Sequence, residues 1–187
     1  MYAGIKDSEF IRGKVPMTKE EIRILSIAKL QLAGDSVLYD IGAGTGSVSV
    51  EAALQHSKGI VYAIERNAAG IDLIRANRDK FKISNMEVVE GEAPECLDGL
   101  PAPTHVFIGG SGGRLIEIIR AVREQNNAAR FVVNAVTLET IGELRKIRDV
   151  FPEYSNMEIV QIGVSRSKEM GGYHMMCAEN PVYIASF

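Results

Sequence analysis

The chain has 187 residues, of which 46% are hydrophobic and 24% are charged, and its formal net charge is −3. These values are ordinary for one globular domain with a sizeable core, and they lack the basic character that favours nucleic-acid binding. No apolar run reaches membrane-spanning length, and Met1 to Gly4 do not resemble a secretory signal, so we expect a cytoplasmic protein with no membrane partner. Cys96 and Cys177 lie in no metal-binding pattern, so we expect free thiols and no metal site.

The first 33 residues are expected to form a polar lead-in followed by a helix. Pro16 precedes Thr18, and Glu21 lies three residues after Thr18, which is a capping-box pattern. Apolar residues then recur at helical spacing, and Gly34 is expected to end the helix. Taken alone, this pattern gives Thr18 only a capping role.

A buried strand over residues 37–41 leads into a glycine-rich turn that opens a helix. Gly42, Gly44 and Gly46 allow a tight turn and the close approach of a ligand, and the N–H groups of the helix start can face that ligand. The glycines alternate as G-x-G-x-G, with Asp40 two residues ahead, unlike the G-x-G-x-x-G of dinucleotide sites. A glycine turn without a ligand is the alternative.

A second buried strand, over residues 59–64, ends at Glu65, roughly twenty residues beyond the glycines. A carboxylate at this place can accept hydrogen bonds from both hydroxyls of a ribose, and a plain surface acid is the alternative. A helix over 69–81 and a third strand over 86–90 follow. Glu92 lies in the next turn, and taken alone it could be a plain surface acid.

A fourth strand over residues 105–108 precedes the loop Gly109-Gly110-Ser111-Gly112-Gly113, and a helix begins near residue 115. Four glycines in five residues cost much chain entropy, so we expect a ligand to lie flush against this backbone. The start of the following helix would favour an anionic group of that ligand. A flexible linker is the alternative.

A fifth strand is expected over residues 131–136, with Thr137 as the cap of the next helix. The pattern then changes, because 157–164 and 181–187 both resemble strands. We expect these two strands to form an antiparallel hairpin with a long insert, residues 165–180, for which no regular structure is predicted.

The chain order therefore predicts a single α/β domain over residues 1–187, with a Rossmann-like, mostly parallel seven-stranded sheet that has helices on both faces. The lead-in and first helix occupy 1–33, and the C-terminal hairpin occupies 157–187. Ligands of such sheets bind at the carboxyl ends of the strands, where all the motifs above fall.

These motifs together resemble the cobalamin-pathway (cobalt-)precorrin-6B C15-methyltransferases (decarboxylating), the CbiT family. The G-x-G-x-G motif is shared by many class I methyltransferases that use S-adenosylmethionine, whereas the lead-in and the second glycine loop are more specific. The matching stretches span nearly the whole chain: Gly4-Ile5-Lys6-Asp7 with Phe10, Pro16 to Glu21, Asp40 to Gly46, Gly91-Glu92-Ala93-Pro94, Phe107 to Gly113, and Asn180-Pro181-Val182.

The resemblance implies a class I methyltransferase fold, a homotetramer, and the transfer of a methyl group from S-adenosylmethionine to C15 of a tetrapyrrole whose C12 acetate is lost as CO2. The family often has Asp where this chain has Glu65, and the longer carboxylate still reaches a ribose. The resemblance implies cofactor contacts at Thr18, Gly42, Ala43, Gly44, Thr45, Gly46, Glu65 and Ala93, to which the first glycine motif adds Asp40. In methyltransferases the turn after the third strand borders the adenine, so the resemblance also makes Glu92 a candidate acceptor for the adenine amino group.

Basic residues are expected to hold the acidic side chains of such a substrate, together with the loop Gly109 to Gly113. The candidates are Lys14, Arg114 and Arg166, and further Arg12, Lys168 and His174, each of which could also be a solvated surface charge. The sequence identifies no catalytic acid or base, and it does not indicate whether the substrate carries cobalt. The alternatives are a methyltransferase acting on RNA or another small molecule, and a non-catalytic cofactor-binding subunit. The net charge and the lack of an Asn/Asp-Pro-Pro-Tyr motif after the fourth strand count against RNA.

Overall fold

The structure is a computed structural model that describes residues 4–187, so Met1 to Ala3 of the expected lead-in lie outside it. A seven-stranded sheet forms its centre. The strands of this sheet are β1 (Val37–Ile41), β2 (Ile60–Glu65), β3 (Met86–Glu90), β4 (His105–Ile108), β5 (Arg130–Ala135), β6 (Glu158–Ile162) and β9 (Val182–Ser186). The helices are α1 (Glu20–Leu30), α2 (Ser47–Gln55), α3 (Ala68–Lys80), α4 (Leu115–Gln125) and α5 (Leu138–Val150), and short 3-10 turns lie at Asp7–Glu9, Glu95–Leu97 and Pro152–Tyr154.

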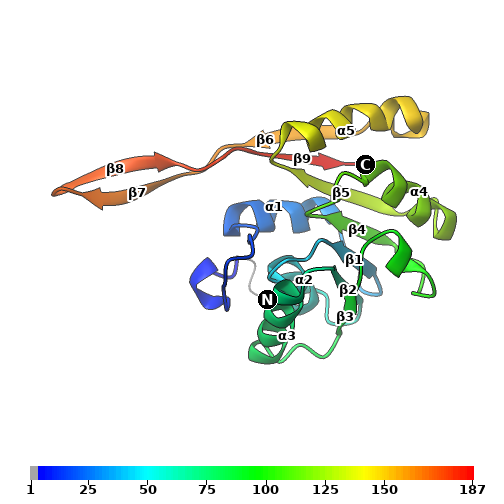
Figure 1. The fold of residues 1–187 in the computed structure, drawn as a ribbon, viewed down its shortest axis with the longest axis horizontal. Coiled ribbons are helices and arrows are strands. Elements are labelled where there is room, and N and C mark those ends of the chain that lie inside the picture. The colour runs from blue at the N-terminus through cyan, green and yellow to red at the C-terminus, as the bar shows by residue number, and fades with distance from the viewer. Residues whose placement is uncertain (1–3) are drawn as a thin grey trace.

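The strand order is β3-β2-β1-β4-β5-β9-β6, with helices on both faces of the sheet (Figure 1). Strand β9 pairs antiparallel with both β5 and β6, and the remaining neighbours pair in parallel. This arrangement confirms the predicted fold class.

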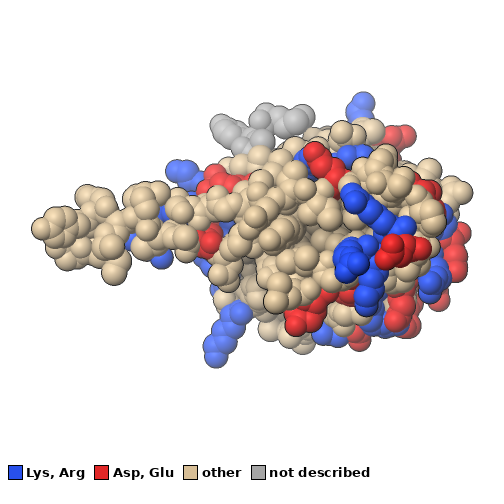
Figure 2. Space-filling view, turned by 90° about the horizontal axis from the view of Figure 1, so that it is seen from above, with Lys and Arg blue, Asp and Glu red and all other residues tan. Residues whose placement is uncertain are grey.

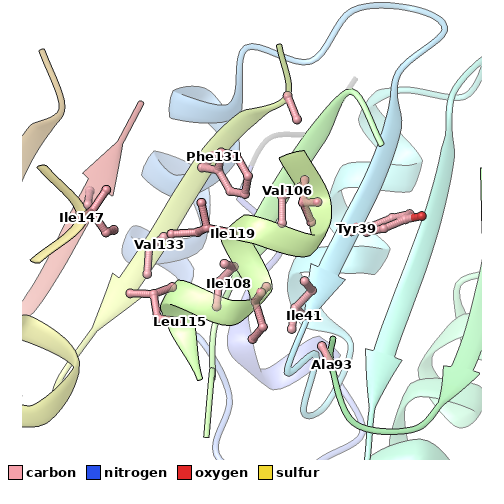
Figure 3. Close-up of a cluster of buried hydrophobic side chains, with 14 of the residues drawn as sticks. Tyr39, Ile41, Ala93, Val106, Ile108, Leu115, Ile119, Phe131, Val133 and Ile147 are labelled. Carbon is pink, nitrogen blue, oxygen red and sulfur yellow. The ribbon is translucent and has the colours of Figure 1, made fainter. Parts of the chain in front are cut away.

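Two apolar cores hold the helices on the sheet, because successive residues of a strand face opposite sides. Ile41 of β1 belongs to the core beneath α4 and α5. Leu38, on the opposite face of the same strand, belongs to the core beneath α1, α2 and α3. In the first core, Leu115 and Ile119 of α4 pack over Val133 of β5 (Figure 3). The carboxyl ends of the strands are thereby held in fixed positions.

The start of α1 differs from the sequence prediction. The helix begins at Glu20 without a side-chain cap, so the predicted capping role of Thr18 is wrong. The Thr18 carbonyl oxygen instead accepts a hydrogen bond from Arg23 Nη1 at 2.8 Å, which fixes the chain just before the helix. The helix ends before a left-handed Gln31 (φ 56°) rather than at Gly34.

The C-terminal region contains the predicted antiparallel pair, β6 and β9. Its insert, for which the sequence predicted no regular structure, forms β7 (Ser165–Met170) and β8 (Tyr173–Ala178). These two strands make an antiparallel ribbon that projects from the body of the molecule (Figures 1 and 2). Thr137 caps α5 as predicted, with its side chain accepting from the N–H of Thr140 at 3.2 Å.

Other features of residues 4–187 bear on the composition-based expectations. Cys96 and Cys177 are both free thiols. Within the described part of the chain, no helix is long and apolar enough to cross a membrane. The same residues contain no cluster of three or more His, Cys, Asp or Glu side chains that could hold a metal ion.

Candidate functional site

A cavity of about 930 Å³ lies at the carboxyl ends of the parallel strands. Its wall combines segments far apart in sequence: residues 14–19 of the lead-in, the first glycine loop at 42–44, and the second glycine loop at 109–112. Asn134 of β5 and Val182 of β9 extend the wall toward the C-terminal strands. The volume is at the upper end of the usual range for small-molecule sites, roughly 300–1,000 Å³.

The first glycine loop is fixed by close contacts with the rest of the chain. Gly42 has φ +71°, and a Cβ there would lie 2.6 Å from the carbonyl oxygen of Gly110. Gly44 has φ +59°, and its Cβ would lie 3.0 Å from the carbonyl oxygen of Pro16. Only glycine fits both the backbone conformation and the space. The loop therefore holds the lead-in and the second glycine loop together around the cavity.

Glu65 links the first glycine loop to the end of β2. Its Oε2 accepts from the Gly44 N–H at 2.8 Å, and its Oε1 accepts from the N–H groups of Arg66 and Asn67 at 2.9 and 2.8 Å. The side chain lines the cavity although the residue is only 9% exposed. A carboxylate offers about four acceptor positions, so these three contacts leave roughly one for a ligand. A grip on both ribose hydroxyls would need a second protein group.

Two predicted cofactor residues stand behind the loop instead of lining the cavity. Asp40 is 1% exposed, and burial raises its pKa to about 7, against the opposing effect of a hydrogen bond from the Ser49 hydroxyl. Thr45 is also 1% exposed. Asp40 Oδ1 and the Thr45 hydroxyl have no hydrogen-bond partner among the described residues. The cavity lining contains neither residue, nor Gly46.

Thr18, Ala43, Glu92 and Ala93, by contrast, all line the cavity. The Glu92 carboxylate is paired with Arg66 Nη1 at 2.5 Å and is 45% exposed. A contact between Glu92 and an adenine amino group stays a prediction, and it would have to share a carboxylate that Arg66 already occupies.

The second glycine loop contributes Gly109, Gly110, Ser111 and Gly112 to the large cavity, while Gly113 lines only a smaller neighbouring cavity. The start of α4, which we expected to receive an anionic group of the ligand, is already occupied. Glu143 of α5 accepts from the Leu115 N–H at 3.2 Å. An anionic ligand group at this helix start stays a prediction, and it would have to share the site with the carboxylate that the chain supplies itself.

Arg114 lies outside the cavity wall. Its guanidinium bonds both oxygens of Glu95 at 2.6 and 2.7 Å and also contacts Glu117. These bonds hold the pKa of Glu95 down, at about 2. The predicted substrate contact of Arg114 would therefore have to compete with two carboxylates.

Of the other predicted basic residues, one lines the cavity and the rest lie outside its wall. Lys14 lines the cavity. Arg166, at the base of the ribbon, is held by Glu21 at 2.5 Å and by Glu179 at 3.1 Å and does not line the cavity. The cavity wall also contains none of the further candidates Arg12, Lys168 and His174.

The sequence prediction missed the residues that anchor the lead-in. Arg23 and Glu51, whose side chains are both 0% exposed, form an ion pair at 2.6 Å. Glu51 Oε1 accepts from the Gly4 N–H at 2.6 Å, and Asn77 bonds both the N–H and the carbonyl of Ile11, at 2.7 and 3.0 Å. Charged residues on helices usually face solvent, so nothing in the local pattern indicated this pair. The lead-in is thus held at Gly4 and Ile11, and its last residues, 14–19, line the cavity before α1 begins.

Comparison with known proteins gives a consistent result. Residues 9–186 match the family model described as a precorrin methyltransferase domain. The cobalt-precorrin-6B C(15)-methyltransferase (decarboxylating) of Salmonella typhimurium is 39% identical over 183 residues, which is 96% of this chain and 93% of that protein.

Two solved structures are similar over nearly their whole length. The precorrin-6y C5,15-methyltransferase from Geobacter metallireducens is 42% identical, with a TM-score of 0.89 and coverage of 98% of this chain and 96% of that one. The precorrin 8W decarboxylase from Methanobacterium thermoautotrophicum is 32% identical, with a TM-score of 0.87 and coverage of 97% and 98%.

Proposed function

The chain belongs to the precorrin methyltransferase family, and from this membership we propose that it methylates C15 and decarboxylates the C12 acetate of precorrin-6B or cobalt-precorrin-6B, with S-adenosylmethionine as methyl donor, in cobalamin biosynthesis. The observation that carries the proposal is the continuous cavity that joins the first glycine loop and Glu65 to the second glycine loop and the ends of β5 and β9. Its two ends accommodate a nucleoside cofactor and a second ligand side by side, as group transfer requires.

The residues at the first end of the cavity fit S-adenosylmethionine. Thr18, Ala93 and the backbone of Gly42 to Gly44 line this end, and Glu65 is held there by three backbone N–H groups. The cofactor supplies a methyl group already activated on a sulfonium. The work of the protein is therefore to orient the two ligands and exclude water. Asp40 and Thr45 contribute by supporting the loop from behind.

The residues at the second end are proposed to hold the tetrapyrrole. The backbone of Gly109, Gly110 and Gly112 offers a surface without side chains, and Lys14 is the one predicted basic residue that lines the cavity and would contact a substrate carboxylate; Lys19 and Arg66 also line the cavity. Arg114 and Arg166 join only by exchanging the carboxylates of this chain for those of the substrate.

We also propose that the protein works in the cytoplasm as a homo-oligomer, a tetramer as the family resemblance implies. The projecting ribbon of β7 and β8 supports the oligomer. Met170, Tyr173, Met175 and Met176 are 53–76% exposed. An isolated two-stranded ribbon is only marginally stable in water, and exposed apolar groups on it favour burial against another copy of the chain. Sedimentation velocity tests this assembly.

Met176→Glu should give a smaller species than the native chain, whereas Leu54→Glu, at an exposed apolar position on α2, should not. An unchanged assembly in Met176→Glu would contradict the role of the ribbon.

The activity itself is tested by incubating the native chain with S-adenosylmethionine and either precorrin-6B or cobalt-precorrin-6B, followed by mass spectrometry. We expect a product that has gained one methyl group and lost CO2. The substrate that is converted at the higher rate identifies the pathway. Unchanged substrates with confirmed cofactor binding would favour a non-catalytic subunit or another small-molecule substrate. Salt-sensitive retention of RNA would favour an RNA methyltransferase.

A further inference from the structure

Asn134 of β5 lines both the large cavity and the smaller one beside it. Its Oδ1 lies 3.1 Å from the hydroxyl of Ser26 in α1, which places the side-chain oxygen toward that helix. Its Nδ2 is shielded from solvent and has no hydrogen-bond partner in the described part of the chain. An amide N–H without an acceptor is costly to bury, so a ligand that brings an acceptor would stabilise this side chain.

The position of Asn134 in the sheet puts it on the substrate side of the cavity. Strand β5 is three positions from β2, which carries Glu65, and one position from β4, which leads into the second glycine loop. At a spacing of about 4.8 Å per strand, three positions correspond to about 14 Å. A cofactor whose ribose contacts Glu65 therefore leaves Asn134 beyond the transferred methyl group.

Apolar residues form part of the wall around Asn134, and Glu139 and Glu143 of α5 line the smaller cavity beside it. Ile22 of α1, Val136 after β5 and Val182 of β9 are apolar members of this wall. Glu179 also lines the cavity, but its carboxylate is paired with Arg166 at 3.1 Å. A substrate carboxylate at Asn134 would thus contact a neutral donor.

We propose that Asn134 is a positioning residue whose Nδ2 donates a hydrogen bond to the substrate carboxylate that leaves as CO2; this inference rests on the proposed function. In the reaction, the C–C bond to that carboxylate breaks and its electron pair enters the conjugated macrocycle. A pair from the macrocycle forms the new C–CH₃ bond, and the pair of the broken S–C bond stays on sulfur. One pair is released and one is consumed, so no oxidant or reductant is needed. A neutral donor orients the carboxylate without the strong stabilisation by a cation that would oppose loss of CO2.

The test compares Asn134→Asp and Asn134→Ala with the native chain. Asp keeps an oxygen toward Ser26 and removes the N–H, and Ala removes the whole amide. A hydrogen bond to a charged group supports a fall in the rate of CO2 loss of roughly tenfold or more in both variants. Calorimetric binding of S-adenosylmethionine and the thermal midpoint should stay native, so that the loss lies in kcat.

Asn156→Asp is the matched control, because Asn156 is exposed and precedes β6 at the edge of the sheet away from the cavity. Native CO2 loss in either Asn134 variant would overturn the inference and leave the proposed function intact. A lowered thermal midpoint with native kcat per folded molecule would also overturn it, since that result means a structural role. A native chain that converts neither substrate would remove the proposed function, and the inference with it.

Discussion

A leucine at position 110 should block the substrate while leaving the fold intact. The φ of Gly110 is outside the left-handed region, and a Cβ built there meets no atom of the chain within 4 Å. Neither backbone strain nor overlap therefore requires glycine at this position. Gly42 is the opposite case, because its φ is +71° and its Cβ would lie 2.6 Å from the Gly110 carbonyl oxygen. We therefore expect the absence of a side chain at Gly110 to serve the ligand that the loop is proposed to face.

The structure gives separate magnitudes for stability and turnover. Replacing glycine at a compatible backbone position stabilises a protein by about 0.4–1 kcal/mol, because the unfolded chain loses freedom, so the free energy of unfolding of Gly110→Leu should stay within about 1 kcal/mol of native. A substrate displaced by about 1 Å from its reacting position loses roughly 100-fold in rate. We therefore expect kcat/KM for the tetrapyrrole to fall by roughly 100-fold or more, with a smaller loss in Gly110→Ala.

The assay combines turnover by mass spectrometry, cofactor affinity by calorimetry and stability by denaturant unfolding. Gly142→Leu is the matched control, because a Cβ at Gly142 in α5 also meets nothing within 4 Å and the residue is exposed. Cofactor affinity should be native in both variants. Native turnover in Gly110→Leu would refute the ligand-based reasoning, and unfolding of that variant would refute the geometric reasoning.

Three further perturbations test the supporting contacts. Glu65→Gln should weaken binding of S-adenosylmethionine roughly tenfold or more, because an amide oxygen cannot replace a carboxylate that accepts hydrogen bonds from three backbone N–H groups. Calorimetry measures the affinity, and a native affinity would contradict the role of the charge. Arg23→Met leaves Glu51 buried without its partner and should lower the free energy of unfolding by about 3–5 kcal/mol in denaturant titrations. A change below about 1 kcal/mol would mean that water hydrates the Glu51 carboxylate in the variant. Asp40, with its pKa raised from an ordinary value near 4 to about 7, binds its proton more tightly when folded, so its contribution to stability falls as pH rises from about 4 to about 7. Asp40→Asn should flatten the dependence of the free energy of unfolding on pH between about 4 and about 7. An unchanged slope in this variant would mean that other groups cause the pH dependence.

The sheet and the glycine loops could be predicted because their signals are local. Buried parallel strands are continuous apolar runs, and Glu65 and the loop 109–113 directly follow such runs at the edge where ligands bind. The ribbon of β7 and β8 could not be predicted this way. Both of its faces are largely exposed, so its residues lack the alternation of buried and exposed positions that marks a strand.

The partners of the charged residues could not be predicted from the sequence, for a different reason. The sequence singled out Arg114 and Arg166 as candidates for substrate contact, but only the folded chain shows that each is already held by two carboxylates. Likewise, only the folded chain shows that Glu143, which lies in the following helix, accepts from the Leu115 N–H at the start of α4. Such pairs depend on how helices pack, which helical periodicity alone does not determine.

The polar residues of the site thus fall into two groups with different consequences for the proposed reaction. Arg114 and Arg166 lie outside the cavity wall with their charges paired, whereas the neutral amide of Asn134, bonded to Ser26 across 108 positions of sequence, lines the cavity. A substrate with several carboxylates needs cations to bind, yet the one carboxylate that is lost reacts more readily where no cation holds it. Separating paired charges from the neutral end of the cavity would serve both requirements within one site, and a cation introduced by Asn134→Lys should accordingly strengthen substrate binding while slowing the loss of CO2.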